Sequence, residues 1–73
     1  MAKLRISNSI RKLRFEADEM TQKALAERVG VTRQTIIAIE NAKYSPTLEL
    51  AFQIAAVFGR PLEEVFQFDG DPK

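Results

Sequence analysis

Three residues, Gly30-Val31-Thr32, separate two segments that each have the apolar spacing of a short helix, and no other feature of the sequence restricts the fold as strongly. The inward-facing residues would be Leu25, Ala26 and Val29 in the segment from Thr21 to Val29, then Ile36 and Ile39 in the segment from Arg33 to Glu40. Gly30 follows the last apolar residue and can take the left-handed conformation that ends a helix. Thr21 and Thr32 are suited to cap the two helices. The sequence therefore predicts two helices held at a steep angle by a very short turn.

A helix is also predicted ahead of this pair, from about Ser7 to about Ala17. Its apolar residues recur at helical spacing at Ile6, Ile10 and Leu13, with Ser7 or Asn8 available as N-cap. Asp18 and Glu19 mark the connection that follows. The run from Lys3 to Ile6 alternates between charged and apolar residues, as a strand would, and it could pair with a strand from Val65 to Phe68.

Two further helices are predicted after the loop from Ala42 to Pro46. Thr47 caps the longer one and Gly59 ends it, and its inward set is Leu48, Ala51, Ile54, Ala55 and Phe58. Pro61 suits the first turn of a short last helix, whose apolar stripe is Leu62, Val65 and Phe66. The fold class is thus all-α, a compact bundle of about five short helices with room for a short terminal strand.

The chain has 73 residues and contains no Cys, His or Trp, which removes disulfides, Cys/His zinc sites and thiol or histidine nucleophiles. The acidic residues near the C-terminus, Glu63, Glu64, Asp69 and Asp71, lie at a helix start and in a loose tail without a basic or metal-binding counterpart, so we expect no enzyme activity, no metal and no cofactor. The apolar runs fall short of the roughly 18 residues of a membrane span, and no signal segment opens the chain. We therefore expect a cytoplasmic protein, with one domain over residues 1–73, an N-terminal extension over 1–6 and a loose tail over 69–73.

The near-neutral total charge of +1 hides an uneven distribution. Residues 1–44 hold nine Lys and Arg against five Asp and Glu, which gives +4, whereas residues 45–73 hold two against five, which gives −3. A polyanion would be attracted to the first part and repelled by the second.

Six short motifs along the chain agree in position with the predicted helices and turn: Thr21-Gln22, Leu25-Ala26, Val29-Gly30-Val31, Arg33-Gln34-Thr35-Ile36, Ile39-Glu40-Asn41 and Pro46-Thr47-Leu48-Glu49-Leu50-Ala51. Through these motifs the chain resembles the Cro and phage-repressor class of helix-turn-helix domains, the XRE type. The resemblance extends from about Ser9 to about Phe66. The resemblance implies that the second helix of the pair, the recognition helix, enters the major groove of double-stranded DNA. It also implies a sequence-specific transcriptional regulator.

The residues that would read base edges follow from this resemblance and are Thr32, Arg33, Gln34, Ile37 and Ala38. Arg33 can bond guanine bidentately and Gln34 can bond adenine in the same way, each worth about 1–3 kcal/mol of discrimination. Ile37 stands where the family usually has a polar residue. Since it lies off the Ile36 and Ile39 stripe, we expect it to be exposed and able to contact a thymine methyl group.

The resemblance also implies which residues would contact DNA phosphates. In the family, the Gln that opens the first helix of the pair, here Gln22, holds a phosphate and braces the residue that matches Gln34. The end of the recognition helix and the next loop would meet the opposite DNA strand through Asn41, Lys43 and Tyr44. Such backbone contacts position a protein without reading sequence.

Ala42 is, after Ile37, the second position at which the chain departs from the family pattern, since the family often has glycine after Asn41. If a left-handed residue is needed there, either Asn41 or Ala42 must supply it. We interpret the basic residues of the first helix as an ordinary solvated face, and the alternative is that they add long-range attraction for DNA: Arg11, Lys12 and Arg14.

Domains of this class usually bind a palindromic operator as a homodimer, and the apolar C-terminal end offers a surface for that contact. Its residues either close the core or meet a second subunit: Leu62, Val65, Phe66 and Phe68. The leading hypothesis is a repressor that binds DNA as a dimer. The alternative is an antitoxin, or another protein-interaction module, that uses the same C-terminal end to hold a partner protein.

Overall fold

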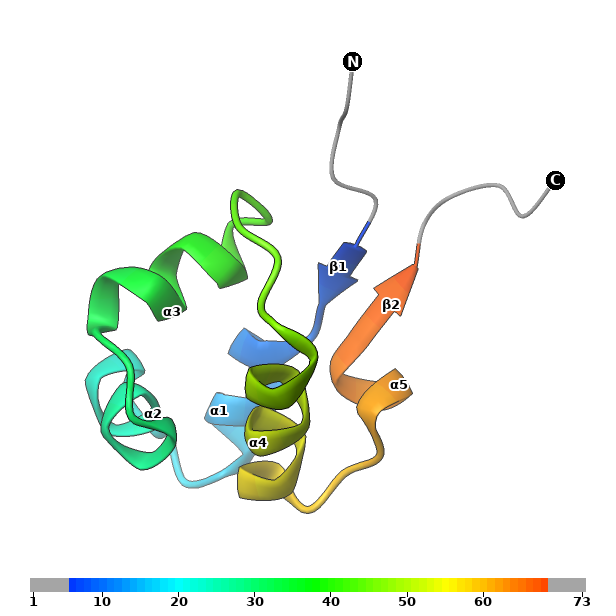
Figure 1. The fold of residues 1–73 in the computed structure, drawn as a ribbon. Coiled ribbons are helices and arrows are strands. Elements are labelled where there is room, and N and C mark those ends of the chain that lie inside the picture. The colour runs from blue at the N-terminus through cyan, green and yellow to red at the C-terminus, as the bar shows by residue number, and fades with distance from the viewer. Residues whose placement is uncertain (1–5, 69–73) are drawn as a thin grey trace, which may run out of the picture.

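Five helices and one two-stranded antiparallel sheet make up residues 6–68, the part of the chain that the computed structural model describes (Figure 1). In chain order the elements are β1 Ile6–Asn8, α1 Ile10–Glu16, α2 Gln22–Val29, α3 Arg33–Glu40, α4 Leu48–Phe58, α5 Leu62–Val65 and β2 Phe66–Phe68. In Figure 1, α2 and α3 lie on one side of α4, and α5 lies with the two strands on the other. The predicted helical bundle with a short terminal strand is confirmed. The tail predicted over 69–73 lies outside the described residues.

Local sequence signals position several of the helix ends. The hydroxyl oxygens of Thr21, Thr32 and Thr47 each accept a hydrogen bond from a backbone N–H in the first helical turn. The donors are Ala24, Thr35 and Leu50, at 3.0, 3.2 and 3.1 Å. Gly30 and Gly59 end α2 and α4 in the left-handed conformation, with φ of 76° and 64°. The short turn between α2 and α3 is therefore built as the sequence predicts.

The start of the first helix differs from the prediction, because α1 begins at Ile10 rather than Ser7. Residues 6–8 form β1 instead, with Ile6 opposite Phe68 and Asn8 opposite Phe66. The Asn8 side chain completes the junction, since its Oδ1 accepts from the Ile10 N–H at 3.2 Å and its Nδ2 donates to the Ile39 carbonyl at 2.9 Å. The predicted pairing of two terminal strands is confirmed at Ile6, but β1 continues to Asn8, and β2 begins at Phe66 because Val65 belongs to α5. Lys3, Leu4 and Arg5 lie outside the described residues.

The core lies where the helices meet, and its largest fully buried side chains are Ile10, Leu25, Ile36, Ile39, Ile54 and Val65. The predicted inward face of α4 is wrong at one position, because Leu48 is 67% exposed and Leu50, at 9%, is buried instead. Successive helical residues are rotated by about 100°, so Leu48 and Leu50 point in nearly opposite directions and cannot both face the core. Packing of α4 against α2 selects the stripe through Leu50 and Ile54.

Candidate nucleic-acid interface

The recognition helix α3 is anchored by one face and open on the other. Ile36 and Ile39 are buried in the core, whereas Arg33 and Gln34 are exposed at the N-terminal end of the helix. Ile37 lies one turn after Arg33 and is half-buried, not exposed as predicted. The open face therefore combines two side chains that can hydrogen-bond to base edges with one that can make an apolar contact.

Two other predicted base contacts have a more restricted environment. Ala38 is half-buried, so it offers only a methyl group at the edge of the open face. Thr32 is exposed, but its hydroxyl oxygen already accepts from the Thr35 N–H and lies 3.1 Å from the Thr35 hydroxyl. Because a side chain that caps a helix holds a fixed rotamer, Thr32 positions α3 whether or not it also touches DNA.

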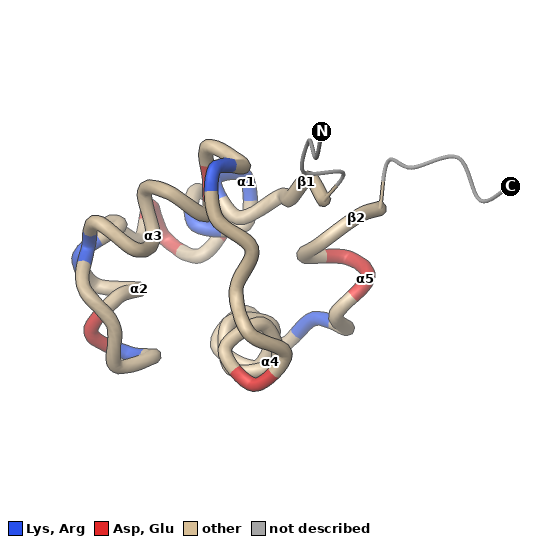
Figure 2. The backbone as a smooth tube through the Cα atoms, turned by 45° about the horizontal axis from the view of Figure 1, so that its top comes forward, with Lys and Arg blue, Asp and Glu red and all other residues tan. Residues whose placement is uncertain are grey.

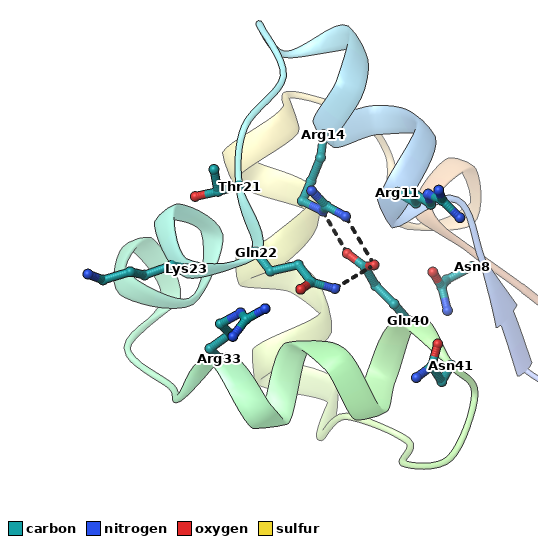
Figure 3. Close-up of a pocket in the computed structure, with 9 residues that line it drawn as sticks. All are labelled: Asn8, Arg11, Arg14, Thr21, Gln22, Lys23, Arg33, Glu40 and Asn41. Carbon is teal, nitrogen blue, oxygen red and sulfur yellow. Dashed lines mark hydrogen bonds and ion pairs between the residues drawn. The ribbon is translucent and has the colours of Figure 1, made fainter.

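A hydrogen-bonded cluster centred on Glu40 ties α3 to α1 and α2 (Figure 3). Arg14 binds the Glu40 carboxylate twice, with Nε–Oε2 at 2.7 Å and Nη2–Oε1 at 3.2 Å. Its Nη1 also donates to the Met20 carbonyl at 2.8 Å. The two side chains of the ion pair are only 15% and 7% exposed. Arg14 is therefore not the solvated basic residue that the sequence predicts, and its charge is cancelled by Glu40.

Gln22 is the third member of this cluster, and its Nε2 donates to Glu40 Oε1 at 3.2 Å. The predicted bracing contact with Gln34 is absent within residues 6–68. A carboxylate is a stronger hydrogen-bond acceptor than an amide, which accounts for the preference of Gln22 for Glu40. Gln22 still lies at the N-terminal end of α2, half-buried and next to the open face of α3.

A groove of about 700 Å³ opens beside this cluster, between α1, α2 and α3. It is lined by Asn8, Arg11, Arg14, Thr21, Gln22, Lys23, Arg33, Glu40 and Asn41. Of its four cations, only Arg14 has a carboxylate partner in the described part of the chain, so Arg11, Lys23 and Arg33 leave the groove positive. A groove with this charge and with amide side chains in its walls is suited to a phosphate backbone.

Four groove residues have no role toward DNA in the sequence-based interpretation: Asn8, Thr21, Lys23 and Glu40. Arg11 was expected to be solvated, and it is exposed but also lines the groove. Lys23 had a usable signal, because it follows Gln22 at the start of α2. No such signal exists for Arg14 and Glu40, which lie far apart in the sequence and meet only in the folded chain.

The loop after α3 carries the other predicted phosphate contacts. Lys43 and Tyr44 are exposed there, outside the groove, and Asn41 is exposed at its wall. Ala42 supplies the left-handed residue that the loop needs, with φ of 59°, whereas Asn41 has φ of −86°. The Lys43 N–H then donates to the Ala38 carbonyl at 2.9 Å, which closes the end of α3 and directs the loop away from it.

Figure 2 shows how the charged residues are distributed over the fold. Lys and Arg lie on α1, α2, the start of α3 and the loop after it, and Arg60 lies between α4 and α5. Glu27 and Glu40 lie on α2 and α3, Glu49 stands at the start of α4, and Glu63 and Glu64 lie on α5. The acidic pair of α5 thus lies away from α3, on the far side of α4.

The predicted dimer surface needs one correction, because Val65 is completely buried in the core of its own subunit. A side chain with no exposed surface cannot contact a second chain. Leu62 and Phe66 are half-buried and pack on the core, and Phe68 is 63% exposed.

An exposed helix after a short glycine turn, braced by a preceding helix and flanked by a positive groove, defines a helix-turn-helix DNA-binding domain. The helix-turn-helix family model matches residues 10–65, which span α1 to α5. The chain belongs to this family of transcriptional regulators, in its XRE type. It is not a family of enzymes.

Individual relatives agree with this assignment. The chain is 54% identical over 52 residues to an uncharacterized HTH-type transcriptional regulator of Methanocaldococcus jannaschii, a match that covers 71% of this chain and 79% of the relative. It is 37% identical over 59 residues to the cryptic phage CTXphi transcriptional repressor RstR of Vibrio cholerae, covering 81% and 52% of the two chains. A crystal structure from Bacteroides fragilis shares the fold, with a TM-score of 0.75 at 22% identity over 85% of this chain and 98% of that one.

No helix within residues 6–68 is long and apolar enough to cross a membrane. The same residues contain no group of three or more acidic side chains that could hold a metal ion.

Proposed function

We propose that this protein recognises a specific DNA sequence by placing α3 in the major groove. The observation that carries the proposal is the position of Arg33 and Gln34, both exposed at the N-terminal end of α3 and next to a groove with uncompensated positive charge. Arg33 would bond the O6 and N7 atoms of guanine, and Gln34 would bond the N6 and N7 atoms of adenine. Ile37, one turn further along, would pack on a thymine methyl group. Thr32 and Ala38 complete the surface that faces the bases.

Phosphates of the two DNA strands would be held on either side of α3. On one side lie Gln22 and the cations of the groove, Arg11 and Lys23. On the other side lie Asn41, Lys43 and Tyr44 at the end of α3 and in the loop after it. Because these contacts release counterions, binding is expected to weaken steeply as salt rises.

We further infer that the protein acts as a homodimer on a palindromic operator and represses transcription. One domain of this kind covers only a half-site, and two half-sites one helical turn apart need two recognition helices about 34 Å apart. Repression is supported by the relative that is named a transcriptional repressor. The names of the relatives favour regulation over the antitoxin interpretation.

The experiment that tests base reading is a binding titration on an operator selected from random DNA, repeated with single-base variants of that operator. Arg33→Ala should lose discrimination at one base position, by about 5- to 150-fold, the equivalent of 1–3 kcal/mol. Lys43→Ala should weaken binding to all sequences alike and lower the salt slope by about 1.

Arg28→Ala provides the matched control, since Arg28 is exposed in the last turn of α2, outside the groove. Its removal should leave base discrimination unchanged. If Arg33→Ala and Lys43→Ala cause equal losses on every sequence, Arg33 does not read bases and the proposed docking of α3 is wrong.

A further inference from the structure

Polar contacts from other elements reach the recognition helix α3 near its C-terminal end. The Thr32 cap does not join α3 to the rest of the fold, because its hydroxyl bonds the N–H of Thr35 within the same turn. Within residues 6–68, α3 is tied to other elements by the Glu40 cluster and by a hydrogen bond from the Asn8 side chain to the Ile39 carbonyl, at 2.9 Å. Of these two contacts, the Asn8 bond is the one made to the backbone of α3. It therefore acts on the helix itself rather than on one of its side chains.

The orientation of the Asn8 amide is fixed at both of its polar atoms. Its Oδ1 accepts from the Ile10 N–H at 3.2 Å, and its Nδ2 donates to the Ile39 carbonyl. Exchange of the two amide atoms would set donor against donor and acceptor against acceptor, so one orientation alone satisfies both neighbours. The backbone beside Asn8 is held as well, since the Ser9 N–H donates to the Val65 carbonyl at 2.8 Å. Asn8 thus presents its donor at a defined place.

The carbonyl that Asn8 holds lies where α3 ends and the next loop begins. The last four carbonyls of a helix have no partner further along it, and Ile39 carries one of them. This carbonyl also accepts from the Ala42 N–H at 3.0 Å, next to the bond from the Lys43 N–H to the Ala38 carbonyl at 2.9 Å. One carbonyl oxygen therefore joins the end of α3, the junction of β1 with α1, and the loop that carries Lys43.

We propose that Asn8 is a positioning residue for DNA recognition. By holding the Ile39 carbonyl it sets the tilt of α3, and with it the direction in which Arg33 and Gln34 point. The inference rests on the base reading proposed above and adds to it a residue that precedes α1, ahead of the helix-turn-helix. Asn8 has no need to touch a base for this role. In Figure 3 it lies beside the C-terminal end of α3, far from Arg33 at the other end.

A small change of tilt is enough to misplace the base-reading side chains. Ile39 follows Arg33 by six residues, which is about 9 Å along a helix. A rotation of about 10° at the C-terminal end would therefore move the Arg33 backbone by about 1.6 Å. Groups in a binding site must be held to within about 0.5 Å of their productive positions. The apolar contacts of Ile36 and Ile39 resist such a tilt weakly, because they are not directional, whereas a hydrogen bond to a carbonyl is.

Loss of the Asn8 donor should differ from loss of a base-reading side chain. Arg33→Ala removes discrimination at one base position. Asn8→Ser should lower discrimination at every position that α3 reads, because Arg33 and Gln34 shift together. We expect a loss of about 3- to 10-fold at each position, a part of the 5- to 150-fold that a complete base contact provides.

The test compares Asn8→Ser with Asn8→Ala on the operator selected from random DNA and on its single-base variants. The Ser hydroxyl can still accept from the Ile10 N–H but is too short to reach the Ile39 carbonyl, whereas Ala loses both bonds. The two variants should therefore differ in stability and share the same loss of discrimination. Thr47→Ala is the matched control, because it removes a cap of α4 and should leave discrimination unchanged. Circular dichroism identifies conditions in which each variant is folded.

Hydrogen exchange in the DNA-free protein provides a readout that is independent of DNA binding. The amide protons of Ala42 and Lys43 bond the last carbonyls of α3. In both Asn8 variants they should exchange about 5- to 10-fold faster relative to the amide protons of α4, because the end of α3 opens locally more often. In Thr47→Ala their exchange rates should not rise relative to those of α4.

The proposal is overturned if discrimination is unchanged in both Asn8 variants, if it falls only in the less stable Asn8→Ala, or if Thr47→Ala loses it equally. Weaker binding to all sequences alike, with discrimination preserved, would show that Asn8 holds a phosphate instead, and would also overturn it. A wild type that does not discriminate between sequences refutes base reading by α3. Unchanged exchange at Ala42 and Lys43 refutes the hold of Asn8 on α3, whatever the result with DNA.

Discussion

Glu40→Gln is expected to destabilise the protein severely, although it replaces one polar side chain by another of the same shape. In the native chain the Glu40 carboxylate accepts two hydrogen bonds from Arg14 and one from Gln22, and only 7% of the Glu40 side chain is exposed. An amide in its place has one oxygen and no charge. Arg14, itself 15% exposed, would then be a nearly buried cation without a counterion.

Removal of one partner from a buried ion pair typically costs 3–5 kcal/mol, because the other charge stays desolvated. We expect about 3 kcal/mol, at the lower end, since Arg14 keeps some access to water and its bond to the Met20 carbonyl. At about 0.05–0.15 kcal/mol per residue, the whole chain has about 4–11 kcal/mol of stability. The substitution should therefore remove a large share of it and lower Tm by about 12–24 °C.

Urea unfolding followed by circular dichroism measures this change, with Glu27→Gln as the matched control. Glu27 is exposed on α2 and has no ion pair within residues 6–68, so its substitution should cost less than about 0.5 kcal/mol. The double variant Arg14→Met with Glu40→Leu should recover much of the loss, because it leaves no buried charge. If Glu40→Gln costs no more than Glu27→Gln, or if the double variant is less stable than Glu40→Gln, the reasoning from a desolvated cation is wrong.

Two further substitutions test the local geometry. Ala42→Gly should stabilise the protein by about 0.5–1 kcal/mol in thermal unfolding, because relief of the left-handed backbone at φ 59° outweighs the added freedom of the unfolded chain; a loss of stability would show that Ala42 is not strained. Leu50→Ala should cost about 2–5 kcal/mol, whereas Leu48→Ala should cost less than about 1 kcal/mol when both are measured at a concentration where the protein is monomeric; equal costs would contradict the orientation of α4.

Features of the fold that depend on neighbouring residues were predictable. The caps at Thr21, Thr32 and Thr47 and the left-handed glycines at Gly30 and Gly59 each act within a few residues of the chain. These helix caps can be predicted from the sequence because the donor, the acceptor and the backbone conformation all belong to one turn. The turn between α2 and α3, and with it the helix-turn-helix, follows from such signals.

Only part of the candidate site could be predicted from the sequence. The exposure of Arg33 and Gln34 follows from the helical spacing of Ile36 and Ile39, which must face inward. The partner of Gln22 did not follow, because Glu40 and Arg14 come from two other helices. The groove beside them exists only where three helices meet, so Arg11 could not be assigned to it by spacing along the chain, whereas Lys23 directly follows Gln22 at the start of α2.

The sequence by itself determined where the helices of the motif begin and end and that Arg33 and Gln34 are exposed on the recognition helix. Only the tertiary structure decided that Ser7 and Asn8 continue the strand of Ile6, since their backbone partners lie at the other end of the chain. It also decided that Val65 belongs to the core and that Leu48 stays outside it, because helical periodicity defines an apolar stripe but not which edge of the stripe the neighbouring helices will cover. Local hydrogen bonds join residues that are close in the sequence, whereas the burial of a side chain depends on elements that are distant in the sequence.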